Sequence, residues 1–593
     1  MVNRTTKLRW RRNWKKRRKQ VEDIGVNAEQ GLEAHFFRRL GRLANVWRFA
    51  AGWVLLLIIL GVGTVMQTRS QSEYYQTLRP ASGGTYTEGI IGVFTNANPL
   101  YATSAVDSSV SRLVFSGLMK YDQNNNLVPD LAQSVTVDSS GKVYTVKLRS
   151  DVRWHDGQPF TAKDVAFTYG MIKNPDARSP MFSTWRDIKV NAKDSQTVVF
   201  ELPNVLSTFG EMITNGIVPE HLLKSVEPAQ MRTARFNSVD PVGTGPFKWD
   251  ELEVQGATQP TRQEVVGLLP NESFYRPMPK VDRFIIHTFR DEAQMVQSYE
   301  AGALTSMVGL ASIPDNVRAV SDFQEYNIPL NGEVMVFFKT TAPPLDDVKV
   351  RRALVQSANT TDILKNLGYS AKNVHGPLLD SHIGYKKDLG QLPYSIKQAE
   401  KYLDAAGWKK DSNGIRKKSG KELTFSLFAQ NTSDYSAVSA ALQNAWKNIG
   451  VRVNVTLQSE ADMQGVVTRH DYDALLHGIS IGTDPDVFAY WHSSQASPSS
   501  PSRLNFSEYK SKEADTSLEA GRTRLDPKVR GAKYEPFLRA WRDDTPALAL
   551  YQPAFLYVTR GKVYNFEPKS MNSITNRYVN VENWMIRQEK SLK

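Results

Sequence analysis

The chain has 593 residues, no cysteine and a formal net charge of +13. The absence of cysteine excludes disulfide bonds, thiolate metal sites, cysteine nucleophiles and attachment through a lipidated cysteine. The positive charge gathers at one end, because residues 1–48 hold fourteen Lys and Arg against four acidic residues. The remainder is close to neutral, so the composition does not indicate a nucleic-acid-binding protein.

Residues 49–66 (FAAGWVLLLIILGVGTVM) contain no charged side chain. As a helix they would extend about 27 Å, close to the thickness of a bilayer core. The alternatives are a buried core helix and a cleaved signal peptide, but the apolar run starts far from residue 1 and lacks a small-x-small cleavage site. We predict a single membrane span with the basic arm in the cytoplasm and the remaining chain outside the cell.

The basic arm, residues 1–48, carries Leu32, Phe36, Leu40, Leu43 and Trp47 at helical spacing. This pattern fits a helix on the inner leaflet, where basic residues attract anionic lipids, or else a solvated basic tail. Residues 67–83 are polar and end in Pro, Ser and Gly, which predicts a flexible linker to the exterior body.

Helical and strand patterns alternate through the exterior body. Residues 143–148 (VYTVKL) alternate as a strand, and Thr161 with Asp164 forms a capping box at the start of a helix. A second capping box, Ser395 with Gln398, opens another helix. Later, residues 423–427 alternate, residues 438–449 repeat at helical spacing and end at Gly450, and residues 451–455 alternate again. This strand–helix–strand unit predicts an α/β fold with a parallel or mixed sheet.

A further predicted strand, residues 473–479, runs into the loop 480–486 (SIGTDPD). In open α/β sheets ligands bind at the carboxyl ends of strands. The loop is therefore the first candidate for a binding site, and an ordinary surface turn is the alternative.

Eight short stretches occur in order over about residues 84–568: 98–101 (NPLY), 118–131, 144–165 (YTVKLRSDVRWHDGQPFTAKDV), 241–247, 345–354, 399–416, 484–486 with 491–494, and 545–546 with Tyr551. Together they resemble the markers of the bacterial extracellular solute-binding proteins of family 5, which bind oligopeptides, dipeptides or nickel for ABC transporters.

The resemblance implies a two-lobed protein of the periplasmic-binding type, the large peptide-binding class, that closes on its ligand about a hinge. One lobe would comprise residues 84–335 and 556–593, with a subdomain at about 126–240, and the other residues 336–555. The implied function is capture of peptides outside the cell and their delivery to an ABC permease and its ATPase, by a monomer that is not an enzyme. A sensory or adhesive receptor of the same fold remains an alternative.

An extended peptide would add as a strand beside residues 476–481, with backbone hydrogen bonds that tolerate many side chains. Aromatic side chains would cover the ligand. The predicted ligand-contacting residues are Leu476, His477, Gly478, Ile479, Ser480, Ile481, Asp484, Asp486, Tyr490, Trp491, Trp408 and Asn98.

The chain departs from the family at the end of this strand. Members that grip a free peptide amino terminus carry an aspartate shortly after a Gly-Trp, whereas residues 478–482 read GISIG. Asp484 or Asp486 would have to replace that carboxylate, although Asp-Pro-Asp resembles a loop-shaping element in the family. The sequence thus predicts that N-blocked peptides bind about as well as free ones.

The same loop also carries features of two other chemistries. Residues 478–482 also match G-x-S-x-G, the nucleophile elbow, but that motif needs a helix directly after the serine and Pro485 prevents one. His477 and His492 flank the loop, so a nickel or haem-like ligand is an alternative to a peptide. His155 lies in a turn that resembles one in the family and is expected to be structural. No catalytic residue, metal ligand or cofactor is predicted.

Overall fold

A computed structural model describes residues 4–32, 47–256, 262–365, 367, 371–500, 503–566 and 568–592. The chain divides into two compact units, Met1–Arg79 with Gln588–Lys593, and Pro80–Arg587.

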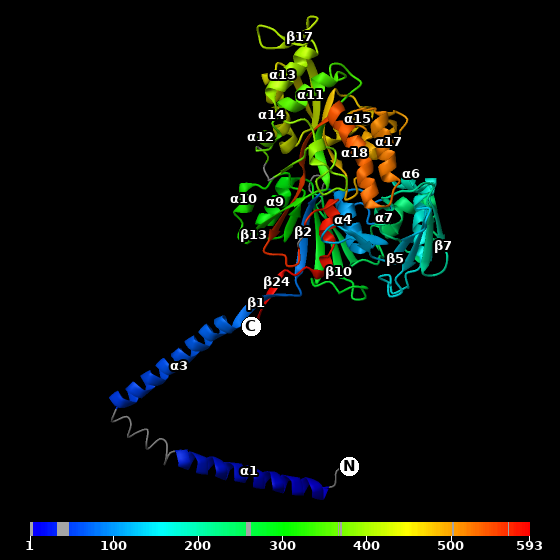
Figure 1. Ribbon diagram of the computed structural model, residues 1–593. Helices are drawn as coiled ribbons and strands as arrows, with labels where there is room; N and C mark the ends of the chain where they lie inside the picture. Colours follow the sequence, from blue (N-terminus) through cyan, green and yellow to red (C-terminus); the bar gives the residue numbers. More distant parts are fainter. Residues whose placement is uncertain are drawn as a thin grey trace. The chain divides into compact units, whose positions relative to one another are not determined.

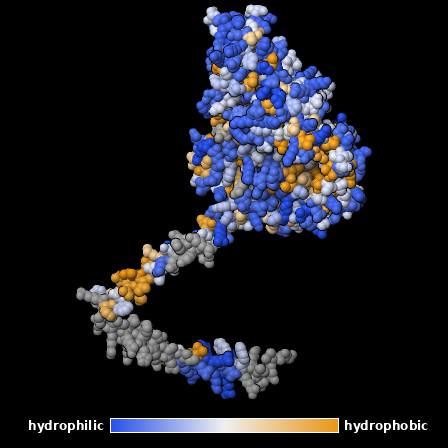
Figure 2. All heavy atoms as spheres, viewed as in Figure 1, coloured by the Kyte–Doolittle hydropathy of each residue, from blue (hydrophilic) through white to orange (hydrophobic). Residues whose placement is uncertain are grey.

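The smaller unit contains two long helices, α1 (Arg4–Leu32) and α3 (Trp47–Tyr75). Within α3, Phe49–Ser70 has a mean hydropathy of 2.3 and is long and apolar enough to cross a membrane, and none of this window is buried. Figure 2 shows a cluster of hydrophobic side chains along part of this helix. The predicted span lies inside this helix. The predicted inner-leaflet pattern falls largely outside the described residues, which do not include Phe36, Leu40 or Leu43.

The stretch after the span differs from the predicted flexible linker. Helix α3 continues to Tyr75, and strand β1 (Gln76–Ala81) follows at once and pairs with β24 (Arg587–Leu592) at the other end of the chain. The partner strand lies some 500 residues away in sequence, so local composition gave no sign of it.

The larger unit is built on two mixed sheets (Figure 1). We call the seven-stranded sheet with its helices lobe I. In spatial order its strands are β13 (Phe323–Pro329), β23 (Ala554–Arg560), β12 (Ser306–Val308), β2 (Thr85–Ile91), β11 (Arg283–Phe289), β10 (Gln263–Pro270) and β9 (Phe247–Gln255). Helix α4 (Ala105–Val114) contributes to one hydrophobic core and α9 (Glu292–Glu300) to another, so helices pack on this sheet in two separate places.

A smaller antiparallel sheet is inserted in lobe I, in the order β5 (Ala132–Val137), β6 (Val143–Leu148), β8 (Thr197–Glu201) and β7 (Lys189–Ala192). Nearby elements are the hairpin β3 (Met119–Tyr121) and β4 (Leu127–Pro129) and the helices α5 (Ala162–Ile172), α6 (Phe182–Trp185), α7 (Phe209–Met212) and α8 (Glu220–Leu223).

We call the six-stranded sheet with its helices lobe II. Its order is β15 (Lys372–Asn373), β22 (Ala547–Gln552), β14 (Gly332–Phe338), β21 (Ala474–Ser480), β19 (Thr424–Gln430) and β20 (Arg452–Gln458). Along β14, alternate side chains enter two different cores, so both faces of this sheet are covered. One core includes α11 (Val348–Ser357), α12 (Thr360–Leu364), α13 (Ile396–Ala405) and α14 (Ser433–Asn448), and the other α15 (Glu460–Arg469), α17 (Lys512–Arg522) and α18 (Pro527–Asp544).

The chain crosses between the two sheets at two short links. Leu330 and Asn331 join β13 to β14, and Pro553 joins β22 to β23. The Gln552 side chain donates a hydrogen bond of 2.9 Å to the Leu330 carbonyl, which ties the two links together. These links are the parts of the chain where a hinge motion would concentrate. The residue boundaries predicted for the lobes stay a prediction.

Several local predictions are confirmed. The strand at Val143–Leu148 is β6, and both hydrogen bonds of the Thr161–Asp164 capping box open α5. The side chain of Ser395 accepts from the Gln398 N–H at the start of α13. Strands β19 and β20 pair in parallel around α14, which is the predicted strand–helix–strand unit, and Gly450 after the helix has φ of +86°.

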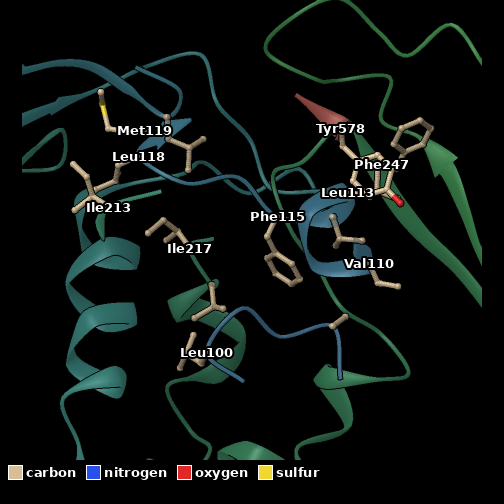
Figure 3. Close-up of a cluster of buried hydrophobic side chains, with 14 of the residues drawn as sticks. Leu100, Val110, Leu113, Phe115, Leu118, Met119, Ile213, Ile217, Phe247 and Tyr578 are labelled. Atoms are coloured by element: carbon tan, nitrogen blue, oxygen red, sulfur yellow. The ribbon is translucent and has the colours of Figure 1, made fainter. Parts of the chain in front are cut away.

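The core of lobe I holds β3 and α7 next to each other. Figure 3 shows Leu118 and Met119 close to Ile213 and Ile217. The backbone N–H groups of Leu118 and Met119 both donate to the Ile213 carbonyl. This contact places Tyr121, at the end of β3, beside the single turn of α7.

Candidate ligand-binding site

Strand β21 has an edge that its neighbours leave partly open. It pairs with β14 as far as Ser480, opposite Gly332, but its parallel ladder with β19 stops at Leu476, opposite Ala429. The cause is the early end of β19, which is followed by α14. Among the described residues, no strand lies on this side of Gly478 to Ser480. An extended chain could therefore add here through backbone hydrogen bonds.

Gly478 allows a close approach at this edge. A Cβ added at this position would lie 3.0 Å from the hydroxyl of Tyr435, in the first turn of α14. Any side chain here would push Tyr435 away from the strand, so the glycine keeps an aromatic residue close to the open edge.

The loop after β21 is held in shape by its surroundings. The Asn331 carbonyl accepts hydrogen bonds of 3.0 Å from the N–H groups of both Ile481 and Gly482. His382 Nε2 donates to the Gly482 carbonyl at 2.9 Å, and Tyr490 donates to the Ser480 carbonyl at 2.8 Å. No helix follows Ser480 directly, since the next one, α16, is Phe488–Trp491. The geometry of a nucleophile elbow is therefore missing.

Asp484 and Asp486 are engaged by arginines of lobe II. Arg530 contacts both carboxylate oxygens of Asp484 at 2.6 Å, and Arg522 lies 3.2 Å from Asp486. Burial raises the pKa of Asp486. Because the arginines neutralise both acids, Asp484 and Asp486 fix the loop to α17 and α18 and do not offer a free carboxylate to a ligand.

Besides Asp484 and Asp486, four predicted contacts need correction. Leu476 is fully buried, with strands on both sides. Trp491 is fully buried between Phe337 and Trp541.

Asn98 is also fully buried and donates to the Asn237 side chain at 3.0 Å. Trp408 precedes β16 (Lys409–Lys410), and its ring is covered by Lys418 of β17 (Arg416–Lys418). Figure 1 shows β17 at the end of lobe II remote from lobe I. Leu476, Trp491 and Asn98 are therefore core residues, and Trp408 lies away from the loop. The prediction failed for these residues because the type of a side chain alone does not tell whether it lies in the core or in a site.

The remaining predicted residues, His477 to Ile481 with Tyr490, lie together at the end of β21 and its loop. Among them the side chain of Ile479 is buried, whereas Ser480 is exposed.

The two histidines do not form a metal site with their neighbours. Burial lowers the pKa of His477, whose ring packs edge-on against Phe506. His492 uses one ring nitrogen on Ser494 and the other on Glu519. Within the described ranges, no group of three His, Cys, Asp or Glu side chains could hold a metal ion.

Lobe I supplies polar residues that the sequence did not indicate. The side-chain oxygen of Asn572 accepts from Asn125 and Asn331, each at 2.9 Å, and from Thr483 at 3.1 Å. Thr483 belongs to the loop of lobe II, so Asn572 joins lobe I, the hinge link and the loop.

Glu211 of α7 also faces this loop. The Tyr121 side chain and the Asp484 N–H donate hydrogen bonds to its carboxylate. The pKa of Glu211 is raised to about 7, mainly by burial and to a smaller extent by the nearby negative charge of Asp484. No sequence marker includes Glu211, and its position depends on the contact of α7 with β3.

Comparison with known proteins agrees with this architecture. A model of bacterial extracellular solute-binding proteins, family 5, matches residues 126–500. The chain belongs to this family. Oligopeptide-binding protein AppA of Bacillus subtilis is 27% identical over 515 residues, which cover 84% of this chain and 92% of AppA.

Solved structures of two relatives share the fold of this family member. The structure of B. subtilis AppA in complex with a nonapeptide has a TM-score of 0.69 and 26% identity, covering 86% of this chain and all of AppA. NikZ of Campylobacter jejuni in complex with Ni(L-His) has a TM-score of 0.71 and 28% identity, covering 84% of this chain and 99% of NikZ. The two-lobed α/β fold is thus shown for this family member, whose relatives are substrate-binding transport proteins.

Proposed function

We propose that this chain captures peptides outside the cell and delivers them to the permease of an ABC transporter. The observation that carries the proposal is the open edge of β21 beyond Leu476, beside a loop that contacts the opposite lobe. Backbone pairing at such an edge recognises an extended chain without reading its side chains. AppA, which is named an oligopeptide-binding protein and has been solved with a nonapeptide, supports the same ligand class.

We infer that the residues that touch the peptide are His477 to Ile481 and Tyr490, with Tyr435 and Glu211 added. The Asp484 and Asp486 pairs with arginine would hold the loop in position. Closure of the lobes would bury the peptide and present a closed surface to the permease and its ATPase. The chain would act as a monomer and without chemical change to its ligand.

The proposed location is the outer face of the cell membrane, with α3 as the anchor. The apolar window Phe49–Ser70 supports a span, and the basic residues before it support a cytoplasmic N-terminus. The helix would take the place of a lipidated cysteine, since the sequence contains no cysteine.

Nickel or another small solute is the second candidate, favoured by the likeness to NikZ. The separate environments of His477 and His492 argue against it. A sensory receptor of the same fold is a third candidate.

Native mass spectrometry of the full-length chain in detergent micelles, purified without added ligand, tests the proposal. Peptide capture predicts a series of bound masses that match short peptides. A single small mass, or a metal removed by a chelator, would favour the solute candidate and make His477 and His492 the next residues to substitute.

A further inference from the structure

We propose that Glu211 binds the free amino terminus of a peptide that lies along the open edge of β21. The inference rests on the peptide-binding function proposed above and names one feature of the ligand that the site would select.

The position of Glu211 is the first argument. It belongs to α7 of lobe I, yet a Cβ added at Gly482 would lie 3.8 Å from Glu211 Oε2. Gly482 follows Ser480, the last residue of β21, by two positions. A chain that pairs with Gly478 to Ser480 and extends toward the loop would therefore bring one of its ends to this carboxylate. A carboxylate attracts the ammonium end of a peptide and repels the carboxyl end, so it also sets the direction of the chain.

The bonding state of Glu211 is the second argument. Tyr121 and the Asp484 N–H each donate to its carboxylate, which has about four acceptor positions and so can take further donors. The side chain is only partly buried, so a ligand can reach it. Among the described residues, no Lys, Arg or His forms an ion pair with Glu211, whereas Asp484 and Asp486 each pair with an arginine. Glu211 is therefore the carboxylate at this end of the edge whose charge is not compensated.

The electrostatic surroundings favour a cation at this point. Burial and the Asp484 charge raise the pKa of Glu211 to about 7, and a bound ammonium would offset both effects. His382, on the Gly482 carbonyl, supplies little positive charge because burial lowers its pKa. The titratable groups that act on Glu211 are Tyr121 from β3 and Asp484 and Asp486 from the loop. Arg530 of α18 pairs with Asp484, and Arg522 of α17 pairs with Asp486.

This inference reverses the sequence-based expectation that N-blocked peptides bind about as well as free ones. The family aspartate is absent from the end of β21, but a carboxylate from the other lobe stands next to Gly482. Since Glu211 and β21 belong to different lobes, the ammonium contact would be complete only when the lobes are closed. Recognition of a free amino terminus would thereby favour closure.

The test uses the full-length chain in detergent micelles with two pools of synthetic nonapeptides, one with free amino termini and the other identical but N-acetylated. Native mass spectrometry measures the competition between the pools. Wild type should prefer the free pool at least tenfold, which corresponds to about 1.4 kcal/mol. Glu211→Gln keeps an oxygen that can accept from Tyr121 and the Asp484 N–H, so the loop should stay folded while the preference is lost.

Glu333→Gln serves as the matched control, because Glu333 is a second buried acid, on β14 opposite Ile479. It should keep the preference. Equal binding of both pools by wild type would overturn the inference and leave the peptide proposal standing, whereas binding of neither pool would overturn both. A preference that survives in Glu211→Gln, or that disappears in both variants, would also contradict the assignment to Glu211.

Discussion

Arg530 donates hydrogen bonds of 2.6 Å from its two terminal nitrogens to the two carboxylate oxygens of Asp484. Both side chains are largely buried. This pair connects helix α18 to the loop that follows β21, and so determines where the proposed peptide-binding edge ends.

Replacement of Arg530 by Met should weaken both folding and ligand capture. The substitution leaves Asp484 largely buried without its cation. Removing one member of a buried ion pair lowers the free energy of unfolding by about 3 kcal/mol. Chemical denaturation would measure the change in free energy of unfolding. Arg524→Met, at an exposed arginine two residues after α17 ends, should change it by less than about 0.5 kcal/mol. Similar losses in the two variants would speak against the role given to the Arg530–Asp484 pair.

A second buried pair stabilises lobe I. Arg577 lies 2.6 Å from Glu88 of β2, and both side chains are fully buried. Arg577→Met should lower the free energy of unfolding by about 3–5 kcal/mol, since Glu88 would remain buried without its cation. Arg186→Met is the control, because Arg186 pairs with Asp187 on the surface and such pairs contribute less than about 1 kcal/mol. Thermal unfolding of the two variants side by side would show the difference.

Glu333 should make the stability of the fold depend on pH. Its side chain is fully buried, neither carboxylate oxygen has a hydrogen-bond partner among the described residues, and burial raises its pKa well above the usual value. Above the pKa of the unfolded chain, the folded state holds this proton more tightly, so stability falls as pH rises.

Glu333→Gln removes the titratable proton and, with it, this dependence of stability on pH. The variant should be more stable than wild type by a margin that grows between about pH 5 and pH 8, by at most about 1.4 kcal/mol per pH unit. Melting temperatures at the two ends of this range would measure the margin. An offset that stays constant with pH would falsify this account of Glu333.

Thr483 and Asn572 join the two lobes, and their hydrogen bond should favour the closed state. Thr483→Val keeps the size of the side chain and removes the bond to Asn572, at a cost of about 1 kcal/mol, or roughly a fivefold loss of the closed population. The smaller closed population should lower the peptide affinity and increase the radius of gyration measured by small-angle X-ray scattering. Thr516→Val, on α17 with its hydroxyl bonded to the Lys512 carbonyl of the same helix, should leave both unchanged.

The anchor can be tested with one charge in α3. Ile59→Arg places a cation near the middle of the apolar window, where it costs about 2.5–3.5 kcal/mol in membrane insertion. A smaller fraction of the chain should resist alkaline extraction from membranes, whereas Ile59→Val should behave as wild type. Equal retention of the two variants would argue against a span at this helix.

The elements that local sequence specifies could be predicted. The Thr161–Asp164 capping box, the strand at Val143–Leu148 and the parallel pair around α14 depend on side chains only a few residues apart. Periodicity and turn chemistry act over such distances, so the α/β class and the apolar helix α3 followed from the sequence.

The candidate site was predicted in part. The loop lies directly after β21, as the sequence indicated, and its role in ligand binding stays a prediction. Trp491 and Asn98 proved to be core residues, and the sequence did not indicate that Glu211, Tyr435 and Asn572 lie near this strand and its loop. Aromatic and amide side chains occur both in cores and in sites, and their burial depends on packing against elements that are distant in sequence.

The sequence by itself determined the family, the two-lobed α/β architecture and the apolar segment of α3, because short motifs and hydrophobic periodicity carry that information. Only the tertiary structure decided which carboxylates are available at the end of β21. Asp484 is neutralised by Arg530, 46 residues further along the chain, and Glu211 reaches the loop from the opposite lobe. The charge left free in a site depends on which partners the fold brings within hydrogen-bonding distance, and no local pattern in the chain records that distance.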